Sequence, residues 1–182
     1  MAPARALRGR RFVSRATLIQ AALAMGLGCA AIAPPVKGAA AQPRTAGEQA
    51  YARADYVRAA RLLLPEAQDG HAVAQTYLGY MYAKGLGVPQ DFALAAKWLT
   101  LAADQGMPAA QYLLGCLYDR GQGVKHDFVM AEIWLDLAAA HAEPRDREFW
   151  EGMRDAVAGK MTQAELAEAQ RRAGAWTAPA AP

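Results

Sequence analysis

Residues 85–92 read Gly-Leu-Gly-Val-Pro-Gln-Asp-Phe, a glycine-rich loop that runs into an aspartate. Shifted along the chain by 36 residues, the pattern returns at residues 121–128 as Gly-Gln-Gly-Val-Lys-His-Asp-Phe. When residues 71–106 are aligned with residues 107–142, 16 of the 36 positions are identical. Self-similarity at one fixed period is the signature of a repeat array. We therefore predict two full structural repeats with these bounds.

Each unit is predicted to fold as two helices joined by the glycine loop. In the first unit, one helix runs from Ala72 to Lys84, and Gly85 ends it in the left-handed conformation that glycine adopts readily. Asp91 then starts the second helix by accepting hydrogen bonds from its first N–H groups. A glycine in the middle of a helix, Gly79, is expected to mark a close helix crossing. The framework positions are Leu78, Gly79, Tyr82, Gly85, Gly87, Asp91, Ala95 and Trp98 in the first unit, and Leu114, Gly115, Tyr118, Gly121, Gly123, Asp127, Ala131 and Trp134 in the second.

Two tryptophans, Trp98 and Trp134, stand among alanines on the expected inner face of the second helices. Small residues let helices approach to about 8–10 Å. An indole then fills the remaining space and buries on the order of 150–250 Å². We expect Trp98→Ala to cost about 3–5 kcal/mol of stability.

The segment before the full repeats is interpreted as a degenerate first unit, residues 42–70. Asp55 aligns with the later aspartates, and helices are expected at about residues 46–53 and from Asp55 to Gly70. Terminal repeats are commonly atypical because one of their faces meets water.

The segment after the repeats, residues 143–176, is predicted to be a C-terminal helical cap. Pro144 suits the first turn of one helix, and Thr162 with Glu165 forms a capping box at the start of another. Residues 177–182 are expected to be a frayed tail.

The first 41 residues have the features of a secretory signal peptide. They combine a basic start, an apolar run and small residues up to Ala41. They also hold six basic residues and no acidic one, which leaves 14 basic and 17 acidic residues in the rest of the chain. The formal charge of +3 therefore disappears with the leader, and no nucleic-acid partner is expected. We expect a periplasmic or secreted protein that meets the membrane only during export.

The cysteine count depends on this processing. Of the two cysteines, Cys29 leaves with the leader, so Cys116 is expected to form no intrachain disulfide. A leader that is retained as a membrane anchor, or lipidated at Cys29, is the alternative.

A longer pattern carries a family resemblance. Ala-x-x-x-Leu-Gly-x-x-Tyr-x-x-Gly-x-Gly-Val-x-x-Asp-x-x-x-Ala-x-x-Trp-x-x-x-Ala-Ala runs from Ala74 to Ala103 and again from Ala110 to Ala139. It resembles the Sel1-like repeat, a relative of the tetratricopeptide repeat. The resemblance implies an all-α fold, a short right-handed α-solenoid of antiparallel helix pairs, and a role as an adaptor in protein complexes. Many bacterial members are secreted or periplasmic. One cysteine-rich branch has been linked to penicillin-type compounds, but this chain lacks the paired cysteines of that branch.

Signals for chemistry are weak in this sequence. The glycine loops follow helices and lack the Gly-Lys-Ser/Thr ending of phosphate-binding loops. No serine follows the leader, and Cys116 lies in an apolar helix where a packing role is expected. The three histidines show no metal-ligand spacing. We therefore predict no catalytic residue, no cofactor and no metal site.

The expected functional feature is a surface, because the first helices of stacked pairs tend to line the concave side of a solenoid. Tyrosine and arginine are frequent hot spots of protein binding, which favours a groove for a peptide or helix. The alternative is that these side chains pack between adjacent first helices. The candidate partner-binding residues are Thr76, Tyr77, Tyr80, Lys84, Tyr112, Cys116 and Arg120.

These observations lead to a non-enzymatic adaptor in the bacterial periplasm as the first hypothesis, with a protein or peptide partner and no small-molecule cofactor. A cell-wall-directed hydrolase or β-lactam-binding protein is the second, and it rests on family analogy alone. A third is a subunit that is stable only inside a larger assembly, since two and a half repeats lie near the lower limit for a solenoid.

Overall fold

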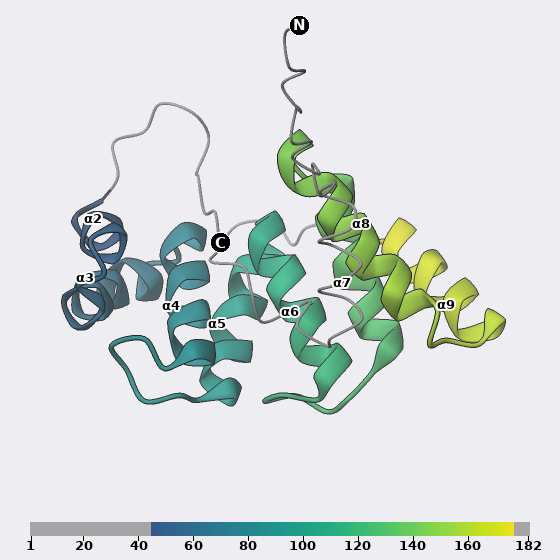
Figure 1. Cartoon of the computed structure of the whole chain (residues 1–182), viewed down its shortest axis with the longest axis horizontal. Coiled ribbons are helices and arrows are strands. Elements are labelled where there is room, and N and C mark those ends of the chain that lie inside the picture. Colours follow the sequence, from purple (N-terminus) through teal and green to yellow (C-terminus); the bar gives the residue numbers. More distant parts are fainter. Residues whose placement is uncertain (1–44, 177–182) are drawn as a thin grey trace, which may run out of the picture.

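The computed structural model describes residues 45–176, and within this range it contains eight helices and no strand (Figure 1). The predicted signal peptide and tail lie outside the described residues. The all-α prediction is confirmed. The helices are α2 (Ala46–Ala52), α3 (Tyr56–Gln68), α4 (Ala72–Lys84), α5 (Phe92–Asp104), α6 (Pro108–Arg120), α7 (Phe128–Ala140), α8 (Pro144–Ala158) and α9 (Gln163–Gly174).

The helices stack in sequence order along one direction, from α2 at one end to α9 at the other (Figure 1). Each helix packs against the next along the chain up to α8, and α9 packs back on α7. The first helices of successive units, α2, α4 and α6, also contact one another. We call the side of the stack that they form the first-helix face.

The helix ends form as the sequence predicts. The Asp91 side chain accepts a hydrogen bond from the Leu94 N–H at 2.9 Å, and Asp127 accepts one from Met130 at 3.0 Å. Gly85 closes α4 with a φ of 69°, a left-handed conformation that costs glycine little. At the other end of the chain, Thr162 and Glu165 form the expected capping box of α9, and Pro144 occupies the first turn of α8.

Two mid-helix glycines mark close crossings, again as predicted. A Cβ at Gly79 would lie 2.5 Å from Leu99 Cγ, and a Cβ at Gly115 would lie 2.8 Å from Leu135 Cγ. Each glycine therefore lets the second helix of its own repeat press its leucine against the first helix. Leu99 and Leu135 are both fully buried at these crossings.

The second glycine of each loop allows a close backbone contact with the preceding unit. Gly87 has a φ of 69°, and a Cβ there would collide with the backbone of Tyr56 at the start of α3. Gly123 has a φ of 71°, and its Cβ would collide with the backbone of Phe92 at the start of α5. Each loop thus rests on the second helix of the preceding unit, which couples neighbouring units through backbone contact.

The two repeat tryptophans are not buried equally, although the sequence predicts that both fill the interior. Trp134 is 6% exposed, and its ring meets the edge of Trp176 at a centroid distance of 6.2 Å. Trp98 is only partly buried. The two tryptophans differ because Trp176, which covers Trp134, follows α9 and so belongs to the C-terminal cap and not to the repeat.

Candidate binding pocket

The structure places most of the predicted partner-binding residues inside the molecule. Arg120 is exposed and Lys84 is partly exposed. The other five are each at most 7% exposed, so they offer little surface to a partner; they are Thr76, Tyr77, Tyr80, Tyr112 and Cys116. The first helices therefore do not present these tyrosines as an exposed aromatic surface.

Two of the tyrosines pack between neighbouring first helices, as the alternative interpretation expected. Tyr77 on α4 meets Tyr51 on α2 with ring centroids 4.7 Å apart. Tyr112 on α6 stacks on Trp150 of α8 at 5.5 Å with the rings nearly parallel. Helix α8 thus takes the place that the first helix of a third repeat would occupy. Thr76 is satisfied within α4, where its hydroxyl donates to the Ala72 carbonyl at 2.8 Å.

The remaining four candidates come together around one pocket between α4 and α6. The space is about 380 Å³, part of it open to solvent. Tyr80 and Lys84 line it from α4, and Cys116 and Arg120 line it from α6. The rest of the lining is largely apolar and consists of Ala83, Phe92, Leu99, Leu113, Leu117 and Gln122.

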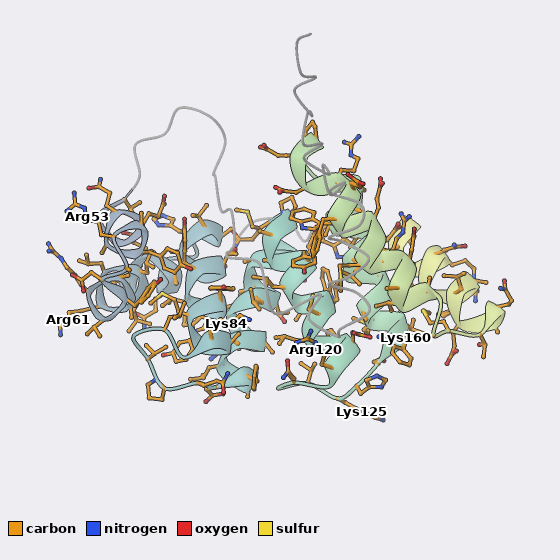
Figure 2. The ribbon with its side chains drawn as sticks, in the orientation of Figure 1. Arg53, Arg61, Lys84, Arg120, Lys125 and Lys160 are labelled. Atoms are coloured by element: carbon orange, nitrogen blue, oxygen red, sulfur yellow. The ribbon has the colours of Figure 1, made fainter. Side chains whose placement is uncertain are left out.

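Positive charge collects at the edge of this pocket. Lys84 Nζ lies 5.8 Å from the centroid of the Tyr80 ring, a distance at which an ammonium group is attracted to a ring face. Partial burial, and then the nearby Arg120 charge, lower the pKa of Lys84. Burial also raises the pKa of Tyr80, so its hydroxyl stays protonated at neutral pH. Figure 2 shows Lys84 and Arg120 near the ends of their neighbouring helices, well away from Arg61 on α3.

The prediction for Cys116 depends on removal of the leader. Cys116 is disulfide-bonded in the structure of the whole chain, and its unpaired state after that removal stays a prediction. The prediction counted only the residues after Ala41 and assumed that the leader with the other cysteine is removed. Because a disulfide sulfur is not a thiolate, Cys116 in this state is no nucleophile.

A pair of buried glutamines ties the repeats together, and the sequence analysis missed it. Gln75 Nε2 donates to the Ala67 carbonyl at 3.0 Å, across the boundary from α4 to α3. Gln111, which is 36 residues further on, repeats the contact with the Ala103 carbonyl at 3.2 Å. The repeated Ala-Gln dipeptide at positions 74–75 and 110–111 was the available signal, since a polar residue on a buried helix face needs a partner.

The second glutamine contact is incomplete. Gln105 Nε2 donates to Gln75 Oε1 at 2.8 Å. His141 stands at the position equivalent to Gln105 and its ring lies 2.9 Å from the Leu137 carbonyl instead. The Oε1 atom of Gln111 is therefore buried without a hydrogen-bond partner among the described residues.

A buried carboxyl group lies where α7 meets α8. Glu132 is 4% exposed, and its Oε2 atom has no hydrogen-bond partner among the described residues. Burial raises the pKa of Glu132 to about 7; the nearby Arg154 opposes this rise, and Asp136 and Asp155 add to it. Arg154 lies 3.5 Å from Asp136 and 2.8 Å from Asp155. This group therefore titrates near neutral pH.

Within residues 45–176, no group of three or more His, Cys, Asp or Glu side chains is arranged to hold a metal ion. No helix in the same range is both long enough and apolar enough to cross a membrane. The candidate binding site in the described structure is the pocket between α4 and α6, which has two cationic residues and a largely apolar lining.

Comparison with known proteins points to one kind of repeat. A family model described as the Sel1 repeat matches residues 72–107 and 108–142. A protective antigen of uropathogenic Escherichia coli strains, whose structure displays an SLR fold, is 31% identical with a TM-score of 0.65 over 70% of this chain. A Sel1 repeat protein from Oxalobacter formigenes is 30% identical with a TM-score of 0.55, also over 70% of this chain. The match covers 27% of the first protein and 53% of the second. No curated protein matches the chain.

Proposed function

Because two segments of this chain match the Sel1 repeat, we propose that it acts as a non-enzymatic adaptor that holds a protein or peptide partner on its first-helix face. Sel1 repeat proteins are generally scaffolds for protein interaction. The observation that carries the proposal is the pocket between α4 and α6, since it joins two repeats and collects four of the predicted binding residues.

The pocket also has the make-up of a peptide subsite. Its apolar wall can cover one side chain of a partner, and its polar edge can orient the backbone or a charged group beside it. Stacked repeats extend such a subsite into a longer surface because each unit adds an equivalent position. We place the protein in the bacterial periplasm, on the basis of the signal-like residues before Gln42.

Photocrosslinking at single positions tests the adaptor role in cells. A photoreactive residue in place of Gln122, in the pocket lining, should give specific protein adducts. The same residue in place of Arg61, which is exposed on α3 and does not line the pocket, is the matched control. Equal adducts at both positions would contradict a partner on the first-helix face.

Location and the enzyme alternative have separate tests. Cell fractionation with mass measurement should find a periplasmic protein that begins near Gln42, and a cytoplasmic full-length chain would refute this placement.

The purified protein is expected to leave peptidoglycan and a chromogenic β-lactam unchanged. Turnover of either compound in proportion to protein concentration would favour the hydrolase instead.

A further inference from the structure

Helix α9 covers one apolar face of α7. It packs on that helix; Trp176, just beyond α9, meets the Trp134 ring, and the Arg172 guanidinium donates to the Met130 sulfur at 3.2 Å. Leu137, further along α7, is 7% exposed. Because Met130, Trp134 and Leu137 are four and then three positions apart, they share one face of the helix. The C-terminal cap therefore closes this face to water.

Helix α5 has the same apolar face 36 residues earlier, and there it is open. Leu94, Trp98 and Leu101 align with the three residues of α7. Leu94 is 38% exposed, Leu101 is 42% exposed, and Trp98 is only partly buried. The main packing partners of α5 are α4 and α6, and none of the helices within residues 45–176 packs on α5 as α9 packs on α7. We call Leu94, Trp98 and Leu101 the α5 face.

The aligned positions of α3 differ from those of α5. They hold Arg58, Leu62 and Pro65, of which Arg58 and Pro65 are exposed. The open apolar face thus belongs to the middle unit of the stack. Three large apolar side chains in a row on one helix are more than scattered surface residues, and exposed groups of this kind mark interaction surfaces.

The packing of α9 on α7 indicates what would fit the α5 face. The buried residues of α9 are Ala169 and Ala173, which are four positions apart. Small residues at this spacing lie on one side of a helix and let two helices approach closely. Trp176 follows three positions later and covers the indole on α7. A helix with small residues at the same spacing, followed by an aromatic residue, would cover the α5 face in the same way.

One residue beside the α5 face sets the charge of its occupant. Lys97 is exposed, whereas the aligned residue of α7, Ile133, is 4% exposed. Lys97 follows Leu94 by three positions, so it borders the same face. Arg172 of α9 lies against the α7 residue that aligns with Leu94. An arginine at this position of an occupant would meet a like charge on α5, and a carboxylate would meet an opposite one.

We propose that the α5 face is a second docking surface, which takes an amphipathic helix of a partner protein with small residues four positions apart and a carboxylate beside Lys97. None of the three residues of this face lines the pocket between α4 and α6. The surface is therefore separate from the one assigned to the adaptor function, and it gives the chain a place for a second partner.

Fluorescence polarisation with helical peptides tests the proposal on the purified protein. The probe is a labelled peptide of residues 162–176 with Arg172→Glu, which keeps the capping box of Thr162 and supplies a carboxylate for Lys97. The comparison peptide also carries Ala169→Gln and Ala173→Gln, which preserve helix propensity but prevent a close approach. The probe should bind at least about tenfold more tightly than the comparison peptide. Equal binding of the two peptides, or no binding of either, would overturn the proposal.

Paired substitutions locate the binding. Leu94→Gln with Leu101→Gln should weaken binding of the probe at least about tenfold. The matched control is Val57→Gln with Leu64→Gln, because it removes two exposed apolar residues at the same spacing from α3, and it should leave the affinity unchanged. Equal losses in the two double variants, or no loss in the first, would refute the α5 face. A melting curve of each variant separates lost binding from lost folding.

A charge reversal and a measurement of oligomeric state complete the test. Lys97→Glu should bind the peptide with the original Arg172 more tightly than the probe, a gain that unfolding would not produce. If the wild type and Lys97→Glu rank the two peptides alike, the carboxylate is refuted. Size-exclusion chromatography should show no dimer that depends on the α5 face. A dimer that Leu94→Gln with Leu101→Gln dissociates would replace the partner helix with a second copy of this chain.

Discussion

Replacing Gly123 by alanine should uncouple the two full repeats. Gly123 has a φ of 71°, and a Cβ at this position would collide with the backbone of Phe92 in the preceding unit. The left-handed conformation costs alanine about 1–2 kcal/mol, of which about 0.4–1 kcal/mol is offset by the stiffer unfolded chain. Because the obstacle is backbone, no rotamer change relieves it, and the loop must lift away from α5. Overpacking of this kind adds about 1–3 kcal/mol. The expected total is a loss of about 2–4 kcal/mol.

Gly106→Ala is the matched control for this prediction. Gly106 also has a positive φ, 78°, but a Cβ there would meet nothing within 4 Å. Its loss should therefore be the conformational part alone, about 1 kcal/mol. The assay is urea denaturation followed by far-ultraviolet circular dichroism, with the free energy of unfolding taken from midpoint and slope. A broader transition in Gly123→Ala would show that the units unfold separately. If the two variants lose the same free energy within about 0.5 kcal/mol, the inter-repeat contact carries no stability and our reasoning fails.

Three further predictions follow from buried groups in the stack. Trp134→Ala should lower the free energy of unfolding by about 3–5 kcal/mol. For Trp98→Ala the loss expected from the sequence is revised downward to about 1–3 kcal/mol, because the Trp98 indole is only partly buried; thermal melts that rank the two variants in the opposite order would contradict the unequal burial. Glu132 has a folded pKa of about 7 against an ordinary value of 4.5, so its contribution to stability is complete below about pH 4.5 and is lost as the pH rises to about 7. The free energy of unfolding of Glu132→Gln should then exceed that of the wild type by about 1–3 kcal/mol above pH 7 and by little near pH 4. A difference in stability that does not change with pH would refute the buried carboxyl. His141→Gln should give Gln111 the partner that Gln75 has and add about 0.5–1.5 kcal/mol; the gain should vanish when Gln111 is also changed to methionine.

The local structure of the repeats could be predicted from the sequence in detail. The bounds of α4, the aspartate caps and the left-handed Gly85 follow from interactions among residues close together in the chain. The close crossing at Gly79 was predictable as well, because a mid-helix glycine carries a cost that a buried contact must offset. The repetition of each signal 36 residues later strengthened every one of these predictions.

The candidate site was predicted less well. Periodicity assigns Tyr77, Tyr80 and Tyr112 to one side of their helices, but it does not say what covers that side. The Tyr51 ring covers Tyr77, and the Trp150 ring of α8 covers Tyr112, so both become core residues. Lys84 and Arg120 are the last residues of α4 and α6, and they keep part of their surface exposed.

The glycine and aspartate pattern was sufficient to specify helix pairs and their repetition, since capping, turn geometry and helix periodicity are short-range properties of the chain. Which surfaces remain open was settled only when the pairs stacked and the terminal helices α2, α8 and α9 closed the ends. Burial depends on contacts between residues far apart in sequence, and one-dimensional periodicity does not contain those distances. The pocket between α4 and α6 is an example: its lining combines residues of α4, α5 and α6 that only the stacking of the helices brings together.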